Sequence, residues 1–363
     1  MTDRLRTDVG GRIAADGEPL IVMRNVWKIF GARQAEALAA LRAGAAGKRE
    51  IAERFNCVVG VADVNLSVDR GEIFCVMGLS GSGKSTLVRH INRLLEPTAG
   101  EILVGGENVM AKSPADLRSL RSHKIGMVFQ NFGLLPHRTV RDNVALPLEI
   151  QRASRQKRFD IAEEALEKVN LAGWGDRYCH ELSGGMQQRV GLARALAADP
   201  DILLMDEPFS ALDPLIRRQL QDEFLSLSTA MGKTVVFITH DLEEAVRIGD
   251  RIAVMKDGMI LQVGTPEEVV PRPEHDYVRK FVADISRLNI LTARSMMVPV
   301  GEHHLTEADL AALPSVRPDH VLGDLVEIAA GHSGDIAVRE AGAIVGLIDR
   351  TAILNGLKRK EAS

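Results

Sequence analysis

The sequence GLSGSGKS, residues 78–85, decides the fold. It matches the phosphate-loop pattern G-x-x-x-x-G-K-[ST] between an apolar run, residues 72–77, and a helical pattern over residues 85–95. Glycines let backbone N–H groups surround phosphate oxygens, and the helix N-terminus adds a positive dipole. We expect a bound nucleoside triphosphate, with Lys84 on its β- and γ-phosphates and the Ser85 hydroxyl on Mg²⁺. The loop residues expected to hold the nucleotide are Gly78, Leu79, Ser80, Gly81, Ser82, Gly83, Lys84, Ser85 and Thr86.

A second apolar run, residues 202–205, ends in Asp206 and Glu207. Two carboxylates at the end of a buried strand are costly unless they face a polar site. Asp206 is suited to hold Mg²⁺ through its water, and Glu207 to polarise the attacking water as general base. The alternative is an acidic pair that caps a helix, which the phosphate loop in the same chain disfavours.

The sequence LSGGMQQR, residues 182–189, contains a second glycine-rich turn, which we call the serine–glycine turn (Ser183, Gly184 and Gly185). Its N–H groups open a helix and predict a second anion site, although the same three residues also suit an ordinary helix start. If both turns cannot reach one nucleotide within one chain, the second serves a partner's nucleotide. That reasoning predicts a head-to-tail dimer with two ATP molecules between the protomers.

Composition excludes several classes of protein. The 363 residues carry 45 Lys+Arg against 49 Asp+Glu, and this mildly acidic balance argues against a nucleic-acid partner. No apolar run approaches the roughly 20 residues of a membrane span, and the charged start predicts a cytoplasmic location. Cys57, Cys75 and Cys179 are scattered, which predicts neither a metal site nor a disulfide framework.

Alternating apolar runs and helical patterns over residues 20–285 predict an α/β domain with an internal sheet. Residues 31–54 predict helix inserted between two early strands, and residues 156–170 and those after Pro214 predict further helices. Composition changes near Asp284. Residues 286–318 show no strand pattern, whereas 335–339 and 343–348 predict strands and 350–358 a helix. That last unit is too short for a large core of its own.

These motifs, with Gln130, residues 210–213 (SALD) and His240, resemble the nucleotide-binding subunit of an ABC transporter over about residues 20–285. The resemblance implies a P-loop NTPase domain at residues 1–285 with a mixed sheet core, an insert at about 31–57 and a helical subdomain at about 130–195. It implies that Gln130 contacts Mg²⁺ or its water, that Asp213 lies across a dimer interface and that His240 contacts the γ-phosphate. It also places Gln188 among the nucleotide-binding residues.

The family stacks adenine on an aromatic side chain from an early strand. Phe30, in the sequence KIFG, aligns best with that role, and Trp27 is the rival; either can instead be a core residue. Residues 131–140 correspond to the region that receives a short helix from a membrane-spanning partner. Two such permease subunits and a substrate-binding protein are therefore implied, with this chain at the cytoplasmic face of a bacterial inner membrane.

Several longer stretches resemble the ATPase of glycine betaine, proline betaine and choline importers, among them residues 73–86, 90–97, 210–217, 243–250 and 276–286. The resemblance implies quaternary-amine uptake and osmoprotection. An ABC ATPase for another substrate, an efflux system and a soluble ABC ATPase are the alternatives.

The end of the chain departs from that family, whose members usually carry two CBS repeats. Residues 319–363 resemble only the second repeat, and residues 286–318 are too irregular for the first. The single α+β unit either pairs across the dimer or, as we favour, is a remnant that stabilises assembly.

Overall fold

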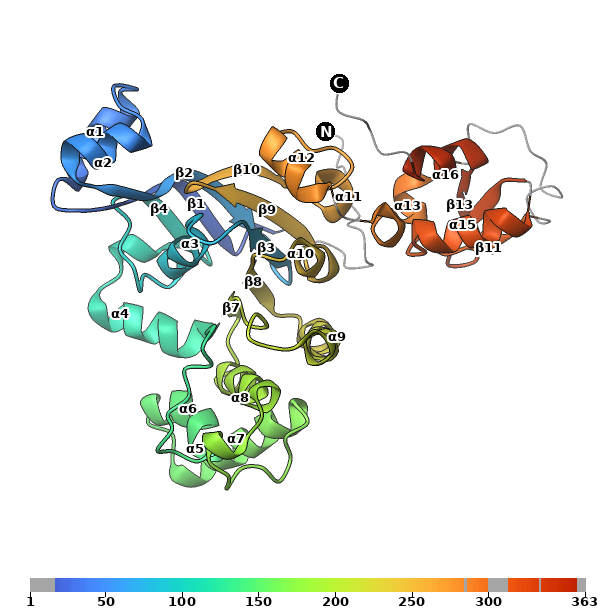
Figure 1. Ribbon diagram of the computed structural model, residues 1–363. Coiled ribbons are helices and arrows are strands. Elements are labelled where there is room, and N and C mark those ends of the chain that lie inside the picture. Colours follow the sequence, from blue (N-terminus) through green and yellow to red (C-terminus); the bar gives the residue numbers. More distant parts are fainter. Residues whose placement is uncertain (1–16, 284–285, 300–312, 333, 358–363) are drawn as a thin grey trace. The chain divides into compact units, whose positions relative to one another are not determined.

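The computed structural model describes residues 17–283, 286–299, 313–332 and 334–357. The chain forms two compact units that meet in sequence between Val263 and Gly264 (Figure 1). The domain boundaries expected from the sequence, at residues 285 and 318, remain predictions. In the part of the chain that the structure describes, no helix is long and apolar enough to cross a membrane.

A six-stranded sheet forms the centre of the first unit, in the order β10-β9-β3-β8-β7-β6. Strand β3 runs parallel to β8 and β9, and β7 runs parallel to β6 and β8. Strands β3, β7 and β8 are buried at every residue, as expected for a parallel sheet covered on both faces. The strands are β3 (Ile73–Met77), β6 (Ile125–Val128), β7 (Ile202–Asp206), β8 (Thr234–Thr239), β9 (Arg251–Lys256) and β10 (Met259–Gly264).

A second, antiparallel sheet has the order β2-β1-β4-β5 and shares a core with the first. Its strands are β1 (Ile21–Phe30), β2 (Val58–Val68), β4 (Ala99–Val104) and β5 (Glu107–Asn108). The insert between β1 and β2 is helical, as predicted, but forms two helices, α1 (Gln34–Arg42) and α2 (Lys48–Phe55). Its buried side chains, Ala37, Leu38 and Ile51 among them, pack with Ile29 of β1 in a separate small core. The expected mixed α/β architecture is confirmed.

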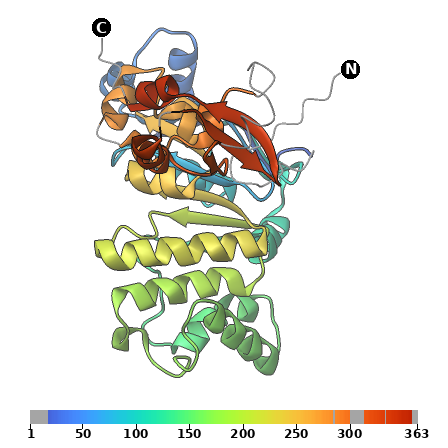
Figure 2. The same ribbon diagram turned by 90° about the vertical axis from the view of Figure 1, so that its right-hand side faces the viewer.

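Helices α5, α6 and α7 gather with α8 in a helical part of the first unit (Figure 1). Helix α8 connects this part to the sheet, because it packs against β6, and it also lies beside α9 (Figure 2). The helices of the first unit are α3 (Lys84–Ile91), α4 (Pro114–Ser119), α5 (Val140–Val144), α6 (Leu146–Ile150), α7 (Arg155–Lys168), α8 (Gly184–Ala197), α9 (Pro214–Met231) and α10 (Leu242–Ile248). Short turns of helix are η1 (Val109–Ala111), η2 (Leu120–Lys124) and η3 (Cys179–Glu181).

The second unit contains a three-stranded sheet, β11-β12-β13, with β11 (Ser315–Val316) parallel to β12 (Ile336–Glu340) and β13 (Ala343–Ile348) antiparallel to it. Its core joins the buried faces of α15 and α16 to this sheet. The described helices of the unit are α11 (Pro266–Val269), α12 (Asp276–Val282), η4 (Arg287–Asn289), α13 (Ala293–Met296), α15 (Leu322–Gly331) and α16 (Arg350–Leu357).

Three sequence-based expectations need correction or limits. Residues 286–318 do contain a strand, because β11 pairs with β12 over two residues, too few to leave a pattern. Helix α3 ends at Ile91 rather than residue 95, since Arg93 adopts a positive φ of 49°. Residues 300–312 of the irregular segment and residues 358–363 of the last unit lie outside the described residues. Cys57, Cys75 and Cys179 are all free and buried.

Candidate functional site

The candidate site is built on four neighbouring parallel strands. Met77 of β3 pairs with Thr239 of β8, and the sheet continues through β7 to β6. The carboxyl ends of these strands therefore meet at one edge, where α/β proteins bind their ligands. The phosphate loop follows β3, Gln130 follows β6, Glu207 follows β7 and His240 follows β8.

The phosphate loop requires glycine at its closest contacts. A Cβ at Gly78 would lie 2.2 Å from the Met255 carbonyl oxygen, and one at Gly83, where φ is +103°, would lie 2.3 Å from the Gly60 carbonyl oxygen. Leu79, Ser80 and Gly81 are exposed, so the crest of the loop is accessible. The Ser82 Oγ is buried and has no partner among the described residues.

Lys84 begins α3 and is 4% exposed. Its Nζ donates to the carbonyl oxygens of Gly78 (2.7 Å) and Leu79 (3.1 Å) and lies 3.6 Å from Glu207 Oε1. Burial lowers the pKa of Lys84, and the nearby carboxylate of Glu207 opposes that shift. The ammonium is thus held at the mouth of the loop beside the carboxylates of β7.

Ser85 and Asp206 lie in direct contact. The Ser85 hydroxyl donates to Asp206 Oδ1 at 2.7 Å, and Arg89 Nη2 lies 3.2 Å from Asp206 Oδ2. A hydroxyl and a carboxylate so close suit Mg²⁺, which takes one or two protein oxygens and completes its shell with water and phosphate. Within the described ranges no group of three or more His, Cys, Asp or Glu side chains is placed to hold a metal ion.

Glu207 is fixed by the strand end and by His240. Its backbone has a φ of 47°, its N–H donates to the Ile238 carbonyl oxygen at 3.1 Å, and its carbonyl accepts from the Ser210 hydroxyl. Its Oε2 lies 2.9 Å from His240 Nδ1. The His240 side chain is 54% exposed and that of Glu207 is 15% exposed, so the pair is open to solvent on the histidine side.

The serine–glycine turn lies with Asp213 on a second surface. Ser183 caps α8 by accepting from the Met186 N–H, and Asp213 caps α9 by accepting from the Ile216 N–H. A Cβ at Gly185 would lie 2.8 Å from Ile216, so the two helix starts are adjacent. Ser183, Gly184 and Asp213 are exposed, and no hydrogen bond or ion pair within the described part joins them to the phosphate loop.

Two expected contacts differ in placement. Gln130 is exposed in the turn after β6, and no described contact joins it to Asp206. Gln188, expected among the nucleotide-binding residues, is 2% exposed and lies inside the protomer. The structure does not bring its side chain to either surface.

Phe30 and Trp27 lie in different surroundings. The Phe30 ring is 40% exposed and packs over Gly60, where an added Cβ would lie 2.7 Å from Phe30 and 3.6 Å from Thr86. Trp27 packs against the small core of the insert. Phe30 is therefore the exposed aromatic side chain beside the phosphate loop, and Lys28 Nζ lies 5.1 Å from the centroid of its ring.

Sequence reasoning missed Arg89. Its ion pair with Asp206 leaves the other oxygen of that carboxylate to Ser85. The signal was its position four residues after Ser85, on the same face of the helix that follows the loop.

Comparison with known proteins accords with this geometry. Residues 61–210 match the ABC transporter family. The trimethylamine N-oxide transport system ATP-binding protein TmoW of Ruegeria pomeroyi is 48% identical over 342 residues, covering 93% of this chain and 97% of that protein. The chain belongs to the ATP-binding proteins of ABC transporters.

Two further comparisons add detail. The glycine betaine transport ATP-binding protein OpuAA of Bacillus subtilis is 53% identical over 286 residues, 78% of this chain and 68% of that protein. Among solved structures, the ATP-binding cassette MJ0796, dimeric and bound to ADP and Pi, is 34% identical with a TM-score of 0.57. That match covers 68% of this ABC protein and 98% of the cassette.

Proposed function

We propose that this ABC ATP-binding protein hydrolyses ATP to drive an importer of small methylated amines, working as a dimer at the cytoplasmic face of a bacterial inner membrane. The observation that carries the ATPase is the contact set at one sheet edge: Lys84 beside Glu207, Ser85 on Asp206 and Glu207 on His240. These side chains hold a phosphate, a metal and a water in one place.

In this proposal, Lys84 and the loop N–H groups bind the β- and γ-phosphates, and the exposed Phe30 ring stacks on adenine, with Lys28 moving off the ring to admit it. Ser85 and Asp206 would hold Mg²⁺, with Gln130 reaching the metal or its water. When bound, Mg²⁺ neutralises charge on the phosphates. Ser80, Gly81 and Thr86 complete the cradle.

Glu207 accepts the proton of the attacking water as general base. His240 orients that carboxylate through its 2.9 Å contact and would contact the γ-phosphate of a bound nucleotide. The strand end and the bond to Ile238 fix the position of Glu207, so catalysis here depends on a preset geometry.

The dimer follows from the second surface. Ser183 and Gly184 are exposed at the start of α8, adjacent to the start of α9 that Asp213 caps, and no hydrogen bond or ion pair of the described residues joins them to the protomer's own phosphate loop. Two copies facing head to tail place each serine–glycine turn on the partner's nucleotide. The solved relative at 34% identity is a dimer, which supports the same arrangement.

The substrate class rests on the relatives. Their names include glycine betaine, proline betaine and choline transport, but the two that match nearly the whole chain are named for trimethylamine N-oxide transport. These solutes share a nitrogen with two or three methyl groups. We therefore include trimethylamine N-oxide beside the betaines expected from the sequence.

A groove in the first unit fits the permease partner. It has a volume of about 720 Å³ and lies between β6, α6 and α8, and its lining combines apolar side chains such as Phe129, Leu146 and Ile150 with four arginines, Arg118, Arg121, Arg152 and Arg194. Gly133, in the segment 131–140 expected to receive a permease helix, also lines the groove. Phe132 is half-buried, and its carbonyl oxygen accepts a hydrogen bond from Arg194. An apolar face of a short permease helix would be buried there.

For the second unit, we propose that the single CBS-like repeat expected at residues 319–363 stabilises assembly rather than binding a ligand. The core of the unit also takes in Leu291, Ala293 and Val316, which precede residue 319.

Uptake of labelled trimethylamine N-oxide, glycine betaine and choline tests the whole proposal. Cells lacking the chain are complemented with the wild type or with Lys84→Ala. We expect uptake of at least one amine with the wild type alone. Uptake of all three without the chain, or with Lys84→Ala, would refute the assignment.

A further inference from the structure

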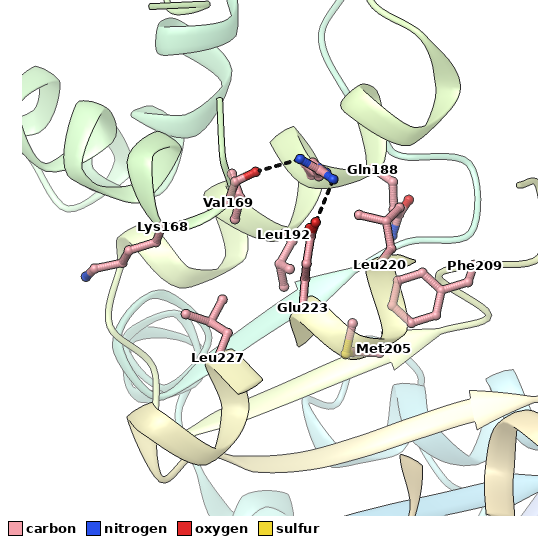
Figure 3. A pocket seen from close by; sticks show the side chains of 10 residues that line it. Lys168, Val169, Gln188, Leu192, Met205, Phe209, Leu220, Glu223 and Leu227 are labelled. Carbon is pink, nitrogen blue, oxygen red and sulfur yellow. Dashed lines mark hydrogen bonds and ion pairs between the residues drawn. The ribbon is translucent and has the colours of Figure 1, made fainter. Parts of the chain in front are cut away.

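A small pocket lies between α8, α9 and the end of β7 (Figure 3). Its volume is about 20 Å³. Most of its lining is apolar, and its polar members are Gln188, Glu223, Lys168 and Arg189. Arg189 donates to the Val169 carbonyl oxygen (3.4 Å) and to Glu223 (2.8 Å), so its guanidinium ties α8 to α9.

Gln188 is the unusual member of this lining. Its side chain is 2% exposed, and neither Nε2 nor Oε1 has a hydrogen-bond partner in the part of the chain that the structure describes. A buried amide that lost both partners would destabilise the fold, because water would bond it in the unfolded chain. A cavity holds one water molecule once its volume exceeds about 10–15 Å³, provided polar groups line it. This pocket meets both conditions.

The pocket also touches three segments of the candidate site. Met205, which lines it, directly precedes Asp206, and Phe209 comes two residues after Glu207. Leu220 lines it too, and its Cδ1 would lie 3.9 Å from a Cβ on Gly185. Helix α8, which begins with the serine–glycine turn, and strand β7, which ends in Asp206, therefore both line this small, partly polar cavity.

We infer that the Gln188 amide binds one ordered water molecule in this pocket, and that the hydrated contact positions α8 and its serine–glycine turn against the strand that carries Asp206 and Glu207. The role in turnover rests on the proposed ATPase function, whereas the water site does not. Gln188 is then a positioning residue: it touches neither nucleotide nor metal. A hydrogen-bonded water can exchange partners when two packed elements shift, which interlocked apolar side chains resist.

The test compares three full-length variants with the wild type. Gln188→Met keeps the length of the side chain without its donor and acceptor, and Gln188→Asn keeps the amide. Gln187→Met is the control, since it removes a neighbouring amide of α8 whose Nε2 already donates to the Leu182 carbonyl oxygen at 3.1 Å. High-resolution crystal structures locate the water, and steady-state ATP hydrolysis gives kcat and KM.

We expect a water bonded to Gln188 in the wild type and none in Gln188→Met. In that variant kcat should fall on the order of fivefold while the KM for ATP changes less than about twofold, because the phosphate loop is untouched. Gln188→Asn should keep a water and lose less of kcat. A dry pocket in the wild type overturns the water site. An unchanged kcat in Gln188→Met, or an equal loss in Gln187→Met, overturns the positioning role. A wild type without ATPase activity would instead refute the proposed function, and the crystal structures would still decide the water site.

Discussion

Replacing Glu207 by glutamine tests the assigned general base with little change of shape. The amide retains an oxygen for the 2.9 Å contact with His240 Nδ1, and the backbone contacts of residue 207 do not involve the side chain. What is lost is the negative charge and the ability to take a proton. General-base assistance contributes about 10²- to 10⁴-fold, so kcat should fall by that factor, about 3–5 kcal/mol in activation free energy.

Binding of ATP should survive the same change. Glu207 Oε1 lies 3.6 Å from Lys84 Nζ, a gross attraction of roughly 5 kcal/mol at an effective dielectric constant of about 20, much of it offset by desolvation. Removing that carboxylate frees the ammonium for phosphate and takes one negative charge from the site. The affinity for ATP should therefore rise or stay the same, and the ATP-bound dimer should accumulate because hydrolysis no longer reopens it.

Single-turnover hydrolysis, nucleotide titration and size-exclusion chromatography with ATP measure these effects. Glu164→Gln makes the same chemical change at an exposed position of α7 and should behave as the wild type. A Glu207→Gln protein that hydrolyses ATP within about threefold of the wild type would refute the base, since general-base loss costs far more. Weaker ATP binding would refute the electrostatic reasoning.

Three further predictions concern the phosphate loop, adenine binding and the buried carboxyl of Glu72. Gly83→Ala should abolish ATP binding or folding. In Gly81→Ala the added Cβ meets no atom within 4 Å, so the change should lower the unfolding free energy by only about 1–2 kcal/mol, because residue 81 has a positive φ of 78°. Thermal unfolding distinguishes the two variants. Phe30→Ala should raise the KM for ATP from about 5-fold to about 150-fold through lost stacking, while Trp27→Ala should lower the melting temperature instead and leave KM unchanged. Burial raises the pKa of Glu72 from 4.5 to about 7, against the opposing bonds from Asp69 N–H and Arg251. A carboxyl whose folded-state pKa is raised stabilises the fold below about pH 4.5 and loses that contribution as the pH rises to about 7, here about 3 kcal/mol. Urea unfolding at about pH 5 and about pH 8 should show a larger loss of stability with pH in the wild type than in Glu72→Gln, which keeps other buried carboxyls of raised pKa such as Glu244 and Glu267.

The sequence predicted those parts of the site that depend on where a strand ends. The apolar run before Gly78 and the one before Asp206 each end at a polar pattern, and parallel strands bring their carboxyl ends to one edge. That rule suffices to place Lys84 near Glu207. Which strands are neighbours does not follow from it, because β3 and β7 are separated by β8, the last of the three in sequence.

What could not be predicted depends on packing between segments far apart in the chain. Nearly every residue of α8 from Gln188 to Ala197 is buried, so no polar stripe marks its faces and the inward position of Gln188 leaves no periodic signal. The ion pair of Arg89 with Asp206 spans 117 residues. The insert is divided into α1 and α2 because Gly44, between the two helices, takes a positive φ of 64°.

The placement of the serine–glycine turn bears on how the proposed site is completed. Lys84 contacts Glu207, which contacts His240, and Ser85 contacts Asp206, whereas the side chains of Ser183 and Asp213 form hydrogen bonds only at their own helix starts within the described residues. In one protomer, therefore, no general base is bonded to the serine–glycine turn, and no serine–glycine turn is bonded to the phosphate loop. In the proposed twofold dimer, the serine–glycine turn of each protomer faces the phosphate loop of the other. The closed dimer would then be bridged by ATP between two surfaces that also expose Leu79 of the phosphate loop and Leu215 at the start of α9. Its stability should follow nucleotide binding, which is the property that a transport cycle requires.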